Sequence, residues 1–349
     1  MALPVYPPVI RPRLQEDGIS LVSVIKGTHT YRRTKRHDYV LDFLPPCMSE
    51  YKLFFNQIAG GFRDVSGSVL FSTSEDGKIV RGLSGVPSEG PVLLVGNHML
   101  MGLELFSLVE EFLREKNIIV RGIAHPMLFS KKIEDLNTEF GLIDWVKVFG
   151  AVPVTGSNLF KLFSTKSHVL LYPGGAREAL HRKGEEYKLF WPEQPEFVRM
   201  AARFGATIIP FGAVGEDDMT ELVLDYDDLM EIPVINDYIR DTTRRAIRVR
   251  EGQSGEVANE ENYIPAILPR IPGRLYYLFG KPIETRGRYE SLKDRENANE
   301  LYLKVKSGVE SCIAYLLKKR EEDPYRSIFD RAIHRALNSP LHEIPAFEP

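Results

Sequence analysis

The chain has few of the features that mark secreted, metal-binding or membrane-spanning proteins. Its 349 residues include only two cysteines, Cys47 and Cys312, which are far apart and belong to no CxxC pair. A disulfide framework and a cysteine metal cluster are therefore excluded, and a reducing compartment, or one indifferent to thiols, fits best. No stretch reaches the roughly 18 to 20 apolar residues that a membrane span needs. A lipid substrate would be met at a membrane surface.

We also expect no leader sequence within these residues, and neither sign of charge is in strong excess. In residues 1–20 prolines interrupt every apolar stretch, which is unlike a secretory signal, and there is no Arg- and Ser-rich helix typical of a transit peptide. The 45 basic and 48 acidic residues give a formal net charge of -3, so we expect no nucleic-acid partner. Because 43% of the residues are hydrophobic, a globular protein with a sizeable core is expected.

Several catalytic motifs are absent as well. The sequence has no GxSxG of serine hydrolases, no GxxxxGK[ST] or GxGxxG of nucleotide-binding proteins and no HExxH of zinc enzymes. We therefore expect neither a metal nor a nucleotide-binding loop. Four histidines have no obvious partners and are interpreted as surface or packing residues: His168, His181, His334 and His342.

Residues 1 to about 70 differ in composition from the rest of the chain. They are rich in proline and carry a basic cluster at 31–37, followed by Pro45-Pro46. We expect a short apolar element at 19–26 and a helix at 49–59. The basic cluster is either a solvated loop or a contact for anionic lipid head groups.

From residue 90 onward, short apolar runs alternate with segments of helical spacing. The pattern predicts strands at 91–95, 118–124, 151–154, 169–172, 207–211 and 275–279. It predicts helices at 102–116, within 140–154, at 156–163, near 197–204, at 234–245, at 301–316 and at 327–337. Residues 216–265 form a charged insertion with a loose acidic loop at 252–262. The alternation predicts an α/β fold with a mixed, mostly parallel sheet flanked by helices.

Asn97 and His98 follow the first of these buried strands, where ligands bind in open α/β sheets. Glu104 falls in the first turn of the next helix, where the helix dipole favours a carboxylate and where it can meet His98. A carboxylate at a ring nitrogen fixes the tautomer and stabilises the imidazolium. We interpret His98 as a general base oriented by Glu104. The alternative is a structural histidine at a strand end.

A second motif, Pro173-Gly174-Gly175-Ala176-Arg177, follows the strand at 169–172. The two glycines let backbone N–H groups turn outward, as an oxyanion or phosphate cradle requires. Arg177 could bind a phosphate or carboxylate through two hydrogen bonds. The alternative is an ordinary turn from strand to helix.

Two further segments end predicted strands. His125 and Pro126 follow the strand at 118–124, and Pro210 lies in the strand at 207–211. Each could line a substrate pocket or belong to the core. For His125 we favour a pocket wall over a second base.

In this order the segments resemble the glycerolipid acyltransferase superfamily, and the Gly174-Gly175 form resembles its diacylglycerol acyltransferase branch. Longer segments resemble the plant phytyl ester synthases from Glu16 to about residue 320: Glu16-Asp17-Gly18-Ile19, Ile25-Lys26-Gly27-Thr28, Lys78-Ile79-Val80-Arg81-Gly82-Leu83 and Arg177-Glu178-Ala179-Leu180-His181. The resemblance implies a glycerolipid-acyltransferase-like fold. The implied donors are acyl-CoA, acyl carrier protein or galactolipid, with phytol and diacylglycerol as acceptors.

The resemblance also implies an organisation and a location. Family members carry an α/β-hydrolase domain and a plastid transit peptide before this region. Residues 1–70 are therefore interpreted as a remnant or linker of that domain, 71–325 as the acyltransferase domain and 326–349 as a C-terminal helix and tail. The implied location is the chloroplast, at plastoglobules, with the cytoplasm as the alternative for a shortened form.

The hypothesis from the sequence is direct acyl transfer with His98 as base and with no cofactor besides the acyl-carrying co-substrate. Glu104 would hold His98, Gly174 and Gly175 would stabilise the oxyanion, and Arg177 would grip a donor phosphate. Asn97, His125, Pro126, Pro173 and Pro210 would line the substrate pocket. Two alternatives remain: an inactive lipid-binding or regulatory fragment, and a thioesterase or lipase that passes the acyl group to water.

Overall fold

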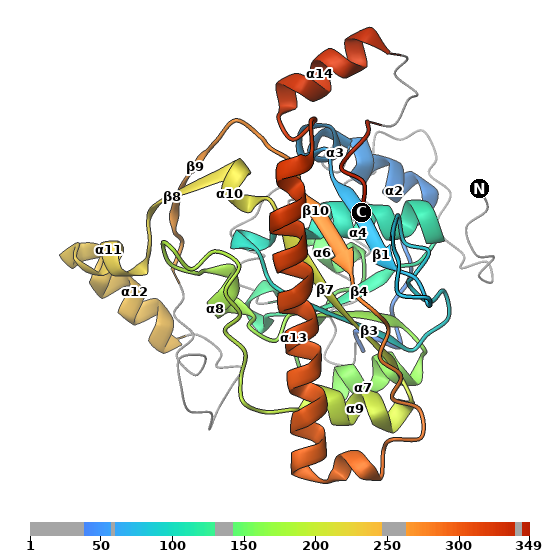
Figure 1. The fold of residues 1–349 in the computed structure, drawn as a ribbon. Coiled ribbons are helices and arrows are strands. Elements are labelled where there is room, and N and C mark those ends of the chain that lie inside the picture. The colour runs from blue at the N-terminus through green and yellow to red at the C-terminus, as the bar shows by residue number, and fades with distance from the viewer. Residues whose placement is uncertain (1–37, 57–59, 130–141, 246–262, 339–343) are drawn as a thin grey trace, which may run out of the picture.

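The computed structural model describes residues 38–56, 60–129, 142–245, 263–338 and 344–349, and an eight-stranded sheet lies at its centre (Figure 1). The sheet has the order β2-β1-β10-β7-β3-β6-β4-β5, and β8 pairs separately with β9. The strands are β1 (Val69–Thr73), β2 (Ile79–Arg81), β3 (Val92–Gly96), β4 (Val120–Ala124), β5 (Val152–Pro153), β6 (His168–Leu171), β7 (Thr207–Val214), β8 (Thr220–Leu224), β9 (Ala266–Pro269) and β10 (Tyr276–Phe279).

Helices flank the sheet on both faces. Their bounds are α2 (Met48–Phe54), α3 (Gly60–Ser66), α4 (Leu105–Lys116), α6 (Leu142–Val148), α7 (Gly156–Ser164), α8 (Ala176–Ala179), α9 (Glu196–Phe204), α10 (Glu216–Met219), α11 (Tyr226–Met230), α12 (Pro233–Arg245), α13 (Arg295–Lys319) and α14 (Ile328–Leu337). Short 3₁₀ turns are η2 (Leu100–Gly102), η3 (Pro126–Phe129), η5 (Ser291–Lys293) and η6 (Arg320–Glu322).

Strand direction places the carboxyl ends of the central strands at one edge of the sheet. β3 runs parallel to both β6 and β7, with Val95 opposite Leu171 and Pro210. β4 is parallel to β6 and to β5, whereas β10 is antiparallel to β7. The predicted mixed, mostly parallel sheet flanked by helices is confirmed. The loops that follow β3, β6 and β7 therefore meet at the same edge.

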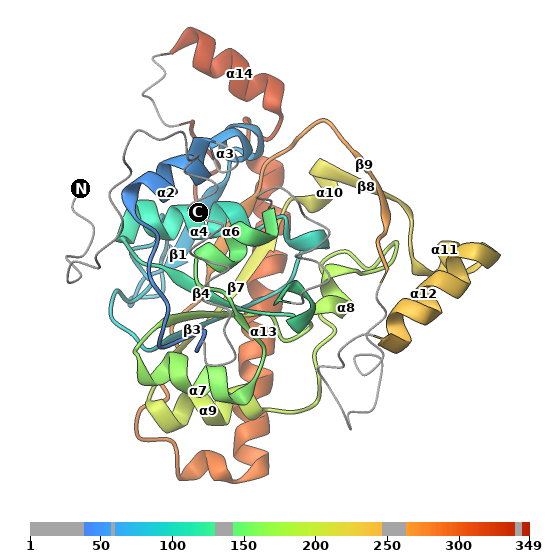
Figure 2. The ribbon, with the colours of Figure 1, turned by 180° about the vertical axis from the view of Figure 1, so that it is seen from behind.

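The two faces of the sheet carry separate apolar clusters. On one face, residues of β3 and β7 pack with α7, α9 and α13, and Figure 1 shows α13 running along the front of the sheet. On the other face, alternate residues of the same strands pack against Leu108 and Phe112 of α4. Figure 2, seen from behind, places α13 beyond the sheet. Strands buried on both faces explain why β3 reads as an unbroken apolar run.

Several elements differ from the sequence-based expectation. The helix expected from residue 102 begins at Leu105, because Met101 (φ 54°) and Gly102 (φ +77°) adopt left-handed backbone conformations that interrupt a helix. The charged insertion holds α10, β8, α11 and α12, of which only α12 was expected. Strands β1, β2, β8 and β9 were not predicted. The segments at 19–26, 31–37 and 252–262 lie outside the described residues.

The predicted divisions near residues 70 and 325 stay predictions. β1, which straddles the first division, lies inside the sheet between β2 and β10. At the other end of the chain, Phe347 stacks on Phe71 of β1 with ring centroids 4.7 Å apart. The last described residues thus help to cover the strand nearest the first division.

Candidate active site

The loop after β3 is fixed to the sheet by Asn97. Its Nδ2 donates to the Ala213 carbonyl at 3.0 Å, and its Oδ1 accepts from the Ala213 amide at 2.8 Å. The Asn97 side chain thus forms a pair of hydrogen bonds with the backbone of β7, as a paired strand residue would. The preceding Gly96 is required, because a Cβ there would come within 2.3 Å of the Phe211 ring. The base of the loop therefore has one position relative to β7.

Two carboxylates from other strand ends hold the next amides of the loop. Glu178 Oε2 accepts from the His98 amide at 2.9 Å, and Glu216 accepts from the Leu100 amide at 2.5 Å. At the far end of the loop, the Tyr277 hydroxyl donates to the Glu104 carbonyl at 2.9 Å. The backbone carrying His98 is thus held from β6, β7 and β10.

His98 and Glu104 meet as the sequence predicted. His98 Nδ1 lies 3.3 Å from Glu104 Oε1 and 3.0 Å from the Met99 carbonyl. The Glu104 side chain is fully buried, whereas the His98 side chain keeps 18% of its surface exposed. The Tyr172 ring packs against the imidazole, with centroids 4.4 Å apart. Nδ1 therefore faces inward. Among the described residues Nε2 makes no hydrogen bond.

Burial sets the protonation of this pair. It lowers the pKa of His98 to about 4. It raises the pKa of Glu104 to about 8, with the negative charge of Glu216 adding to the effect. Burial likewise raises the pKa of Glu216 to about 8. Between these values the imidazole is neutral and the pair shares one dissociable proton. A neutral imidazole is the form that accepts a proton at pH 7.

The Gly174-Gly175 turn after β6 is filled by a side chain of the same chain. The Gly175 amide donates to the Tyr172 carbonyl at 3.1 Å, which closes the turn. A Cβ on Gly174 would come within 2.1 Å of Glu178 Cδ, so that carboxylate lies directly over the glycine. Glu178 also accepts from the Phe190 amide at 2.9 Å. The oxyanion role of the two glycines stays a prediction.

Arg177 lies in an ion pair within its own segment. Its two terminal nitrogens each donate to Glu185 at 2.8 Å, and its guanidinium lies 3.9 Å from the Phe190 ring centroid. The side chain is buried. A donor phosphate would have to displace Glu185, and the phosphate contact stays a prediction. What the geometry shows is that Arg177 fixes the segment from 177 to 190.

The other predicted pocket residues are spread along the sheet. Pro173 is buried beside Gly174. His125 is half-buried at the end of β4, where its Nδ1 accepts from the Met127 amide at 3.2 Å, and Pro126 begins η3. Pro210 lies on the α13 face, since a Cβ on Gly308 of α13 would come within 2.8 Å of its Cγ. The structure therefore brings Asn97, His98 and Glu104 together, while Pro210 packs against a helix.

Sequence reasoning missed Glu178, Glu216 and His181. His181 is buried, and its Nε2 lies 3.6 Å from Glu216 Oε1. Its interpretation as a surface or packing residue overlooked this partner. The available signal was position: Glu216 follows β7, and Glu178 follows β6, so both belong to loops at the edge that carries His98.

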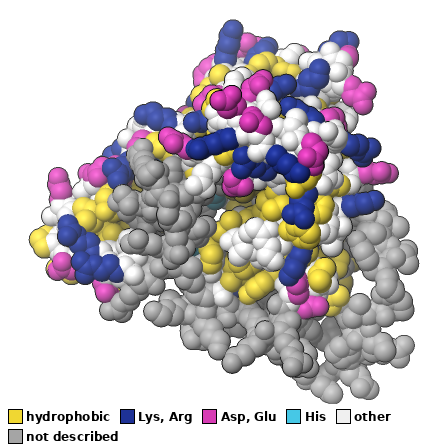
Figure 3. Space-filling model, turned by 90° about the horizontal axis from the view of Figure 1, so that it is seen from below, with side chains coloured by type: hydrophobic (Ala, Val, Ile, Leu, Met, Phe, Trp, Pro, Cys, Tyr) yellow, Lys and Arg dark blue, Asp and Glu magenta, His cyan; other side chains and the backbone are white. Residues whose placement is uncertain are grey.

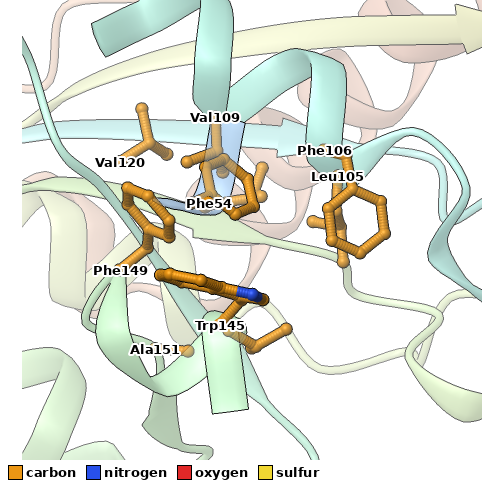
Figure 4. Close-up of a pocket in the computed structure, with 11 residues that line it drawn as sticks. Phe54, Leu105, Phe106, Val109, Val120, Trp145, Phe149 and Ala151 are labelled. Atoms are coloured by element: carbon orange, nitrogen blue, oxygen red, sulfur yellow. The ribbon is translucent and has the colours of Figure 1, made fainter. Parts of the chain in front are cut away.

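Figure 4 shows an apolar pocket formed by residues of α2, α4 and α6. Its cavity volume is about 50 Å³, and it is partly open to the surface. It is lined by residues of α2, α4, α6 and the neighbouring strands, among them Phe54, Leu105, Phe106, Val109, Trp145 and Phe149. Leu105 connects it to His98, because a Cβ on Gly102 would lie 3.1 Å from Leu105 Cδ1 and 3.3 Å from His98 Cε1. A lining of this kind suits a hydrocarbon chain.

Hydrophobic side chains also gather on the outer surface. The face seen from below in Figure 3 shows an apolar patch with Lys and Arg side chains beside it. Among the described residues, no helix combines the length and the apolar character that crossing a membrane requires.

Parts of the chain are similar to known acyltransferases. Residues 129–265 match the family model described as diacylglycerol acyltransferase. Human 2-acylglycerol O-acyltransferase 3 is 34% identical over 82 residues, 23% of this chain and 24% of that protein. The crystal structure of the 1-acyl-sn-glycerophosphate acyltransferase of Thermotoga maritima aligns with a TM-score of 0.40 and 11% identity, over 77% of this chain and 83% of that one.

The longest sequence matches are to two plant proteins of Arabidopsis thaliana. Over 338 residues, 96% of this chain, it is 61% identical to phytyl ester synthase 1, chloroplastic, and 52% identical to phytyl ester synthase 2, chloroplastic. Each match covers 48% of the relative, so the chain spans about half the length of these curated relatives. Along almost its whole length, the chain is similar to the phytyl ester synthases.

Proposed function

We propose that this chain is an O-acyltransferase. It moves a fatty-acyl group from acyl-CoA, acyl carrier protein or a galactolipid to a lipid alcohol, phytol or diacylglycerol. The observation that carries the proposal is the His98–Glu104 pair, 3.3 Å apart at the carboxyl end of β3 and beside an apolar pocket. The relatedness to phytyl ester synthases supports the choice of acceptors.

In the proposed reaction the alcohol oxygen attacks the carbonyl carbon of the thioester as His98 Nε2 takes its proton. The carbon–sulfur bond then breaks, and His98 returns the proton to the leaving thiolate, so that an ester and a free thiol are formed. Glu104 orients the ring through Nδ1 and shares its proton. No covalent acyl-enzyme is required, because the alcohol attacks the donor directly.

The pocket accounts for the apolar part of a substrate. Burying a hydrocarbon chain against aromatic and aliphatic side chains contributes about 0.8 kcal/mol per methylene group. We assign the pocket lined by Phe54, Trp145 and Phe149 to such a chain, of the donor or of the acceptor. We place the reaction at the lipid-body surface of the chloroplast, because both plant relatives are named chloroplastic.

The test is a transferase assay on the purified chain, with acyl-CoA and either phytol or diacylglycerol in mixed micelles. Wild type should form the ester, and His98→Ala should lower the rate by about 10² to 10⁴-fold, the contribution typical of a general base. His168→Asn is the matched control. It changes a buried histidine that contacts the Pro87 carbonyl at 2.9 Å, away from the pair, and should keep the activity.

Three outcomes would count against the proposal. Unchanged ester formation by a folded His98→Ala protein would show that His98 is not the general base. Free fatty acid released at the same rate without added alcohol indicates a thioesterase or lipase. A folded wild-type chain that binds lipid but forms no ester with any acceptor indicates the inactive lipid-binding alternative.

A further inference from the structure

Helix α14 is anchored by a buried arginine. Arg331 has 1% of its surface exposed, and its guanidinium donates to backbone carbonyls on three separate segments. These are Tyr325 at 3.1 Å, Arg326 at 2.7 Å, Val65 at 2.6 Å and Gly273 at 2.8 Å. The side of the helix that faces the protein is therefore held by charge-assisted hydrogen bonds.

The opposite side of α14 is apolar and faces outward. Phe329, Ile333 and Leu337 are 61%, 57% and 80% exposed. Their spacing of four residues places them in one row along the helix. The alanines at 332 and 336, both exposed, lie in the same row. The helix thus shows its large hydrophobic side chains to the surroundings and buries its arginine.

This row lies at the end of the sheet that carries His98. Arg331 contacts Val65, which lies in α3 just before β1, and Gly273, which lies just before β10. β10 begins where β7 ends, since Tyr276 pairs with Val214. Both ribbon views show α14 at the outermost point of this end of the molecule (Figures 1 and 2).

A second exposed apolar side chain adjoins the helix. Ile271 is 65% exposed, and the next residue, Pro272, accepts a hydrogen bond from the Ile328 amide at 3.2 Å. The basic side chains nearby are matched by acids: Arg335 pairs with Asp64, and Arg326 pairs with Asp218. This corner of the surface is therefore apolar without an excess of positive charge.

We propose that α14 docks the protein on a lipid surface by inserting the row Phe329, Ile333 and Leu337. The proposal deepens the proposed function, because it brings the edge of the sheet with His98 toward the phase that holds a lipid alcohol. A ten-residue helix is about 15 Å long, which suits a helix lying in the interface rather than one spanning a bilayer.

The size of the row favours a lipid surface over a protein partner. A stable protein interface takes about 800 Å² and 20 to 30 residues from each partner, whereas this row has three large side chains and two alanines. A lipid surface accepts bulky apolar side chains without shape complementarity. Because Arg335 and Arg326 are paired with acids, attraction to anionic head groups is a small contribution, and docking should depend weakly on salt.

The test is flotation of the full chain with neutral phosphatidylcholine vesicles and with triolein emulsions coated by the same lipid. Wild type should float with both, at low and at high NaCl concentration. The triple variant Phe329→Ser, Ile333→Ser, Leu337→Ser should lower the bound-to-free ratio at least tenfold. Its melting temperature should stay close to that of wild type, because all three side chains are more than half exposed.

The control is Leu41→Ser, Leu303→Ser, which changes side chains that are 65% and 52% exposed elsewhere on the molecule and should keep wild-type flotation. The proposal is overturned if the triple variant floats like wild type, or if the control loses as much binding. It is also overturned if wild type sediments as a dimer that the triple variant abolishes.

Flotation does not depend on ester formation. Lipid binding that needs the row, without any ester formed, would sink the proposed function alone. Ester formed in micelles by a chain whose flotation ignores the row would sink the docking proposal alone.

Discussion

The loop after β3 and helix α14 lie at the same end of the sheet and distribute polarity in opposite ways. The loop buries carboxylates beneath a histidine, whereas α14 buries a guanidinium and exposes its apolar side chains. The two regions differ in how many hydrogen bonds their buried ionisable groups receive. Arg331 is satisfied by four carbonyls, and Glu178 by two amides. Among the described residues, the Glu104 carboxyl group receives no hydrogen bond of ordinary geometry, and its titratable neighbours are His98, whose Nδ1 lies 3.3 Å away, and the Tyr172 hydroxyl.

This difference distinguishes buried charged groups that stabilise the fold from buried groups that are typical of functional sites. A fully satisfied buried group stabilises one backbone arrangement, which fits Arg331 and Glu178. A buried carboxyl group without such hydrogen bonds costs stability and is typical of functional sites. The comparison supports the proposed catalytic role of Glu104 and a structural role of Arg331, and both roles can be tested by substitution.

Replacing Arg331 should have the largest effect. Arg331→Met leaves four carbonyls without their donor, and we expect a loss of about 4 kcal/mol in the free energy of unfolding, from roughly 1 kcal/mol or more per unpaired group. Arg335→Met on the same helix breaks an exposed pair with Asp64 and should cost less than about 1 kcal/mol. Urea unfolding measures both. Equal losses would mean that Arg331 is no anchor.

Replacing Glu104 should affect activity rather than stability. Glu104→Gln keeps the shape of the side chain but removes the titratable carboxyl group that orients His98 and shares its proton, and we expect kcat to fall about 100-fold, equivalent to about 2.7 kcal/mol. The free energy of unfolding should hold or rise, because a buried carboxyl is removed. Glu110→Gln in α4 breaks the pair between the buried Glu110 carboxylate and the partly exposed Arg63 at 3.3 Å, and should show the reverse pattern. Similar activity in both variants would contradict the orienting role.

The smallest effect expected of a substitution concerns the pH dependence of stability. The pKa values of Glu104 and Glu216 are raised to about 8, so the unfolded state loses these protons at lower pH, and stability falls as pH rises toward 8. The lowered pKa of His98 acts in the opposite direction, but its contribution fades above about pH 6.5, the pKa of an unperturbed histidine. Each glutamate then costs at most about 1.4 kcal/mol per pH unit between pH 6.5 and 8.

Urea unfolding at several pH values in this window checks the slope. Glu216→Gln should flatten the curve by up to about 2 kcal/mol over the window. Glu196→Gln, which changes an exposed carboxylate on α9, should leave it as it is in wild type. A wild-type curve that is already flat would show that the buried glutamates ionise as easily as exposed ones.

The sequence was sufficient for the parts of the site that are local in the chain. Asn97, His98 and Glu104 could be predicted because they follow one buried strand within eight residues. Glu178 and Glu216 reach the same loop from 80 and 116 residues away, which only the strand order reveals. Pro210 could have been placed, because it shares the strand face of Ile208, which belongs to the α13 cluster.

For α14 the sequence predicted the element but not its orientation. Apolar spacing at Phe329, Ile333 and Leu337 indicates a helix with one hydrophobic side, and such a side normally faces the core. The orientation is reversed by the carbonyls of Val65 and Gly273, 266 and 58 residues away from Arg331. No local pattern carries that information. The same applies to the helix expected at residue 102, whose start was displaced by the left-handed Met101.

The way the loop after β3 is held has a consequence for protein engineering. Asn97 forms two hydrogen bonds with the backbone of Ala213, and Glu178 and Glu216 accept hydrogen bonds from the backbone amides of residues 98 and 100. Almost any amino acid supplies such a backbone amide. The side chain of Met101, half-exposed on this loop, is not part of the fastening. The scaffold therefore fixes the position of His98 through contacts that do not involve the Met101 side chain. Because the backbone of Met101 is left-handed (φ 54°), we expect Gly, Asn and Asp to be tolerated there better than β-branched residues.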